Sequence, residues 1–103
     1  MKGSMTIGDD TRPLDSWSES DITQAINRRR HDHQNVCVII EIKESCAEMR
    51  LSTPSCARGG GGRAPNECER RVFDLWHKLH LDDANYAPGN VVAFLKQAPH
   101  ILN

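Results

Sequence analysis

The sequence is poor in aromatic side chains, has no long apolar run and carries no large excess of charge. Phe, Trp and Tyr make up 5% of the 103 residues, and hydrophobic residues make up 38%. An average domain has roughly 45–50% apolar residues when glycine is included. No run approaches the ~20 apolar residues of a membrane span, and no charged and apolar leader opens the chain. We therefore expect a cytoplasmic protein with no membrane partner.

The four cysteines lack the spacing of the common metal and redox motifs, because no CxxC occurs. Disulfide frameworks belong mainly to secreted proteins. Without a secretory signal, the sequence predicts four free thiols, at Cys37, Cys46, Cys56 and Cys68.

A net charge of −1 disfavours a general binder of polyanions. The charge is unevenly spread, since residues 27–80 hold ten Lys and Arg against seven Asp and Glu. The remaining residues hold three against seven. A mildly basic centre between acidic ends suggests an anionic partner.

The length fits a single domain, which we place at residues 17–103. Residues 1–16 combine few apolar side chains with Gly, Pro and Asp, so a flexible, disordered N-terminal segment is expected. The first helix is predicted over 19–30, where Ser18 and Asp21 form a capping box before the apolar stripe of Ile22, Ala25 and Ile26.

An antiparallel hairpin is predicted next, from a β-branched run over 36–43 and a return strand over 46–53. A second helix follows over 67–80, because Asn66 and Glu69 repeat the capping pattern before an amphipathic stretch. A third helix is predicted over 90–97, ending before Pro99. The result is an α+β domain in the order α-β-β-α-α. Because a lone hairpin is marginal in water, helices must cover it. A sheet continued across a two-fold axis would also protect it, so we expect a homodimer.

The glycine-rich segment 54–67 joins the second strand to the second helix. A Walker A loop needs lysine and a hydroxyl after its last glycine, and here Arg63-Ala64 follows. The acidic first turn of the helix behind it also disfavours phosphate. The favoured function is a small binding or adaptor module, not an enzyme and with no cofactor, in which this segment contacts a protein or anionic partner. The contact residues are Arg58, Gly59, Gly60, Gly61, Gly62 and Arg63.

Two alternatives remain open. The first is a nucleic-acid-associated accessory protein whose arginine groups contact phosphates. These arginines are Arg28, Arg29, Arg30, Arg70 and Arg71. The second is a small thiol- or metal-dependent enzyme, in which Cys56 is the exposed thiol and the candidate metal ligands are His77, His80 and Cys56. No stretch carries a set of motifs that identifies a family.

Overall fold

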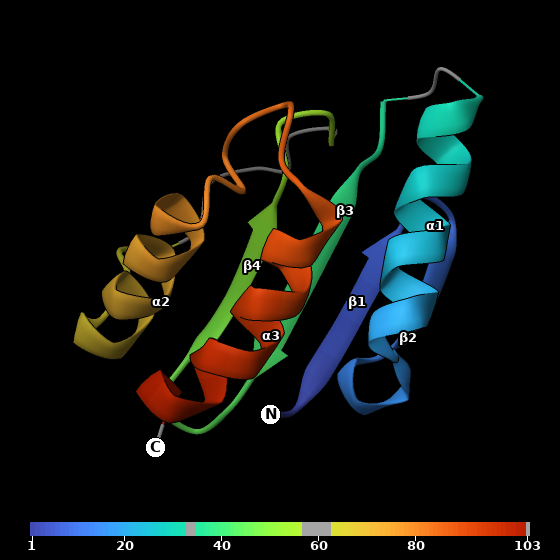
Figure 1. Cartoon of the computed structure of the whole chain (residues 1–103). Coiled ribbons are helices and arrows are strands. Elements are labelled where there is room, and N and C mark those ends of the chain that lie inside the picture. Colours follow the sequence, from blue (N-terminus) through green and yellow to red (C-terminus); the bar gives the residue numbers. More distant parts are fainter. Residues whose placement is uncertain (33–34, 57–62, 103) are drawn as a thin grey trace.

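The computed structural model describes residues 1–32, 35–56 and 63–102. Within these ranges the elements are β1 (Gly3–Ile7), β2 (Asp10–Pro13), the short 3-10 helix η1 (Leu14–Ser16), α1 (Glu19–His31), β3 (Val38–Lys43), β4 (Glu48–Ser52), α2 (Glu67–Lys78) and α3 (Pro88–Leu102). The strands form one antiparallel sheet in the order β2-β1-β3-β4. The three helices lie on one face of the sheet, with α3 between α1 and α2 (Figure 1).

The N-terminal segment is not the disordered stretch that the sequence predicted. Strand β1 occupies an inner position of the sheet, between β2 and β3. Met5 and Ile7 point into the core and are 0% exposed. Gly8, at φ 65°, and Asp9 turn the chain from β1 into β2, so these two residues belong to a hairpin turn and not to a disordered tail. The folded domain therefore includes β1 and β2, which lie in the segment 1–16 predicted to be flexible.

The central elements agree with the α+β prediction. Ser18 and Asp21 form the capping box of α1, and Asn66 and Glu69 form that of α2. Strands β3 and β4 pair as the expected hairpin. Since β1 joins this hairpin within the same chain, a second subunit is not required to complete the sheet. The homodimer therefore stays a prediction, but the need to extend a two-stranded sheet no longer supports it.

Helix α3 is longer than predicted, because it begins at Pro88 and continues through Pro99 to Leu102. A proline inside a helix removes one backbone hydrogen bond. Burial of its last turns offsets that loss, since Ala98 is 0% exposed and Ile101 packs against the core.

The core fills the space between the sheet and the helices. Phe94 of α3 meets the ring of Trp76 of α2 edge-on, with the ring centroids 5.2 Å apart. The Trp17 indole packs beneath Arg12 and donates its N–H to the Met5 carbonyl at 3.1 Å. These contacts join both ends of the chain to one core. No helix in the described part of the chain is long and apolar enough to cross a membrane.

Candidate functional site

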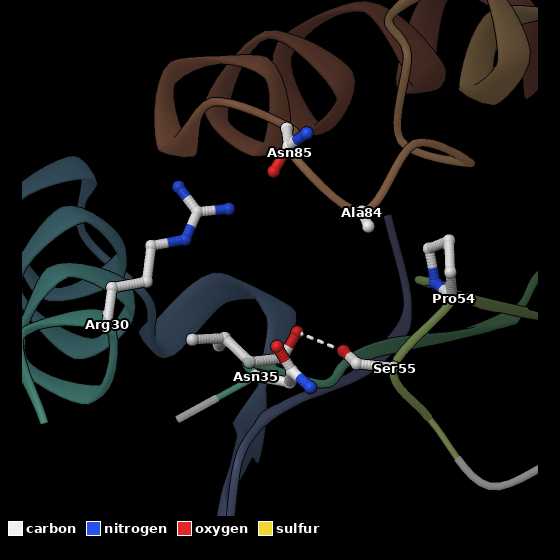
Figure 2. Close-up of a pocket in the computed structure, with 7 residues that line it drawn as sticks. Arg30, Asn35, Pro54, Ser55, Ala84 and Asn85 are labelled. Carbon is white, nitrogen blue, oxygen red and sulfur yellow. Dashed lines mark hydrogen bonds between the residues drawn. The ribbon is translucent and has the colours of Figure 1, made fainter. Parts of the chain in front are cut away.

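A polar cleft opens at the end of the sheet where β3 begins and β4 ends. It has a volume of about 610 Å³. Three segments meet there: the last turn of α1, the residues flanking the β3–β4 hairpin, and the α2–α3 connection (Figure 2). The lining residues are Arg30, Asn35, Val36, Pro54, Ser55, Ala84 and Asn85.

Among the described residues of this lining, Arg30 alone carries a charged side chain, and its position follows from the helix period. It lies one turn after the buried Ile26, so it stays near the core side of α1 and is half-buried. Its guanidinium stacks over the Tyr86 ring, 4.6 Å from the ring centroid, and donates to the Tyr86 carbonyl at 2.5 Å. The cation is therefore held in place before any ligand binds.

The carbonyl of Val36 connects the walls of the cleft. It accepts hydrogen bonds from Ser55 Oγ at 2.6 Å and from the Tyr86 hydroxyl at 3.0 Å. Thr53 Oγ1, at 3.4 Å, also faces it. Burial raises the pKa of Tyr86 despite the opposing charge of Arg30, so the phenol remains a neutral donor to this carbonyl. The Val36 carbonyl oxygen thus links the two ends of the β3–β4 hairpin to the α2–α3 connection through hydrogen bonds.

The cleft offers hydrogen-bond donors, and none of its described lining residues carries a carboxylate. Arg30 and the exposed amides of Asn35 and Asn85 face the open space in Figure 2. The Ser55 hydroxyl already donates to the Val36 carbonyl (dashed in Figure 2), and among the described lining residues there is no histidine or acid to activate it as a nucleophile. A guanidinium and amide N–H groups are donors that can bind an oxyanion.

The glycine-rich contact residues of the sequence analysis are only partly described. Arg58, Gly59, Gly60, Gly61 and Gly62 lie outside the described residues. The described start of that segment, at Pro54 and Ser55, forms one wall of the polar cleft.

Arg63 lies elsewhere, beside the start of β4. Its two terminal nitrogens donate to the two carboxylate oxygens of Glu69 at 2.6 Å each. Glu69 is 1% exposed. The Arg63 guanidinium and the backbone N–H of Asn66 lower the pKa of Glu69 to about 2. Glu69 also accepts the backbone N–H of Glu48 at 2.9 Å, so this pair fastens the start of α2 to β4.

The two arginine groups proposed for nucleic acid are not brought together. Arg28, Arg29 and Arg30 end α1, whereas Arg70 and Arg71 lie in α2, on the other side of α3 (Figure 1).

Several of these arginines also have acidic partners. Arg29 donates to Asp9 at 2.6 Å, and Arg71 to Glu67 at 2.9 Å. Arg28 and Arg29 line a second hollow of about 660 Å³ together with the carboxylates of Asp9 and Asp32. This arrangement does not form a continuous basic stripe.

The prediction of four free thiols is wrong, because Cys37 and Cys56 form a disulfide. The hairpin explains the pairing, since Cys37 directly precedes β3 and Cys56 follows β4 at the same end. While the bridge is intact, Cys56 is neither a nucleophile nor a metal ligand. Disulfides are rare in cytosolic proteins, so the cytoplasmic location stays a prediction.

The histidine candidates do not gather into a metal site. His77 pairs with Asp82, and His80 sits in the connection to α3 at φ 57°. Across residues 1–32, 35–56 and 63–102, no three His, Cys, Asp or Glu side chains are placed to hold a metal ion together.

Sequence reasoning did not select Asn35, Ser55, Asn85 or Tyr86 as site residues. Each lies in a connection, and no local pattern shows that these connections meet. Arg30 was selected, but as part of an arginine run and not as a cation stacked on Tyr86.

Comparisons of this chain with protein-family models, curated proteins and solved structures found no match.

Proposed function

We propose that the protein is a small binding module, and that the polar cleft recognises an acidic side chain of a protein partner. The observation that carries the proposal is the pre-positioned Arg30 guanidinium in a cleft lined by hydrogen-bond donors. A planar guanidinium matches a carboxylate with two parallel hydrogen bonds.

Pre-positioning reduces the cost of binding. A free arginine side chain loses rotamer freedom when it captures a ligand, whereas Arg30 is already fixed by Tyr86. One terminal nitrogen serves the Tyr86 carbonyl, which leaves the other N–H groups for a ligand. Asn35 and Asn85, on opposite walls, add neutral donors that fix the orientation of the bound carboxylate.

The test compares two synthetic peptides that differ only in charge, one with Asp and Glu and the other with Asn and Gln at the same positions. Binding is followed by the backbone amide shifts of the protein in NMR titrations. We expect the acidic peptide alone to shift the signals of Asn35, Ser55 and Asn85.

The matched variants are Arg30→Gln and Arg28→Gln. Both remove one positive charge from the last turn of α1, but Arg28 is exposed and does not line the polar cleft. Binding should be lost in the first and retained in the second. Arg30→Lys keeps the charge without the planar fork, so it should bind more weakly than the natural chain. Equal binding of the acidic peptide by all variants would contradict the proposal. A titration with single-stranded DNA that shifts the amide signals around Arg70 and Arg71 would also contradict it.

A further inference from the structure

Two free thiols, Cys46 and Cys68, face each other at the end of the β3–β4 hairpin opposite the polar cleft. Their sulfur atoms are 3.3 Å apart. Cys46 lies in the turn between β3 and β4, and Cys68 is the second residue of α2. Both side chains are half-buried and pack against the core. The sequence separates them widely, and only the fold makes them neighbours.

The backbone around each thiol is fixed by several independent contacts. The Cys46 carbonyl accepts from the Asn66 amide at 2.9 Å, and Cys46 Sγ contacts the Leu102 carbonyl at 3.2 Å. Next to Cys68, the buried Glu69 accepts the N–H of Glu48. The first turn of α2 is therefore held against β4, and the two sulfurs are kept together.

The two thiols also have different hydrogen-bond acceptors, Cys46 Sγ for Cys68 and the Leu102 carbonyl for Cys46. Cys68 donates its S–H to Cys46 Sγ. This hydrogen bond, followed by burial, raises the pKa of Cys68 above its usual value. The Cys68 S–H therefore points at the Cys46 sulfur, which is the atom with which Cys68 would form a bond.

We propose that Cys46 and Cys68 form a redox-active dithiol that is oxidised reversibly to a second disulfide by a low-molecular-weight disulfide of the glutathione type. The Cys46 thiolate attacks one sulfur of the oxidant, whose S–S bond breaks and releases one thiolate that takes up a proton. Cys68 then loses its proton and attacks the Cys46 sulfur of the mixed disulfide, which releases the second thiolate. Two protein thiols are oxidised, and one disulfide is reduced to two thiols.

The two sulfur atoms already lie close to bonding distance. The sulfurs must approach from 3.3 Å to the ~2.05 Å of a disulfide bond. Because Cys37 and Cys56 lie at the other end of the hairpin, they are not placed to exchange with this pair. The oxidised chain would hold the hairpin by a covalent link at each end, and the new link would fix α2 to the sheet.

The test uses the natural chain with the Cys37–Cys56 disulfide intact. The protein is equilibrated in buffers with increasing ratios of oxidised to reduced glutathione, then free thiols are blocked and tryptic peptides are analysed by mass spectrometry. We expect peptides 44–50 and 64–70 to appear covalently joined in the monomer, with both thiols lost together and recovered by dithiothreitol.

Cys46→Ser and Cys68→Ser are the controls, since each leaves one thiol of the pair. Both should accumulate a mixed disulfide with glutathione at ratios where the natural chain has already closed its internal bond. Three results would overturn the proposal: separate glutathione adducts on both cysteines of the natural chain, no loss of thiols at any ratio, or crosslinks to Cys37, Cys56 or another chain.

Discussion

Replacement of Glu69 by glutamine should remove a defined part of the acid sensitivity of this fold. The Glu69 carboxylate is almost fully covered and accepts four hydrogen bonds. Two come from Arg63 at 2.6 Å, and the backbone N–H groups of Asn66 and Glu48 each donate at 2.9 Å. All four favour the charged form, and they act together at the point where α2 meets β4.

The size of the effect follows from the pKa of this carboxyl. It is about 2 in the folded chain, and the ordinary value of 4.5 applies to the unfolded chain. Because the folded value is the lower one, Glu69 stabilises the fold fully above pH 4.5, and this stability is lost as the pH falls through about 2. Midway between the two values, unfolding takes up about 0.9 proton at this single position.

The measurement is the denaturation midpoint of the natural chain and of Glu69→Gln between pH 2 and pH 7. Glutamine has no charge to titrate, so the variant should be less stable near neutral pH and should approach the natural chain in acid. Glu67→Gln is the matched control, because Glu67 lies on the same helical turn but is exposed. A stability difference for Glu69→Gln that stays constant down to pH 2, or an equal pH dependence in Glu67→Gln, would refute the reasoning.

Three other substitutions test the packing and the crosslink. Phe94→Ala should cost about 3–5 kcal/mol in urea unfolding, because Phe94 is fully buried against Trp76; a loss below ~1 kcal/mol would contradict the described core. Gly3→Ala should weaken the pairing of β1 with β3, since the new Cβ would lie 1.9 Å from a β3 carbonyl oxygen and φ is +140°. The backbone amides of β1 should then exchange with solvent faster than in the natural chain, and unchanged exchange rates would contradict this. Cys37→Ser should cost about 3 kcal/mol, because the Cys37–Cys56 disulfide closes a separation of 19 residues. Addition of a reducing agent should then destabilise the natural chain but not the variant.

The helices and the central hairpin could be predicted because their signals are local. Ser18 and Asn66 each begin a helix with a matching acid three residues later, and the apolar residues that follow repeat with the helix period. The register of β3 and β4 follows from alternation and a short turn. Their flanking cysteines therefore offer a signal for the disulfide, which the general rule that disulfides belong mainly to secreted proteins outweighs in a sequence-based prediction.

The N-terminal hairpin was missed because its evidence is not local. Met5 and Ile7 are only two apolar residues in a polar stretch, and their burial depends on pairing with β3, which is far away in the sequence. The polar cleft depends even more on contacts between segments that are distant in the sequence. Arg30 ends α1, and Asn35, Ser55 and Asn85 lie in separate connections. Hydrogen bonds to the Val36 carbonyl and stacking of Arg30 on Tyr86 hold these segments together.

Capping and periodicity act over a few residues, so an α+β domain with two capped helices and a β-branched hairpin can be predicted from the chain alone. The four-stranded sheet, the pairing of the cysteines and the roles of the arginines cannot be predicted in this way. Those features depend on which distant segments share one core. The glycine-rich segment drew attention in the sequence, but the groups with defined chemistry lie on its described flanks, in the polar cleft on one side and the Arg63–Glu69 pair on the other.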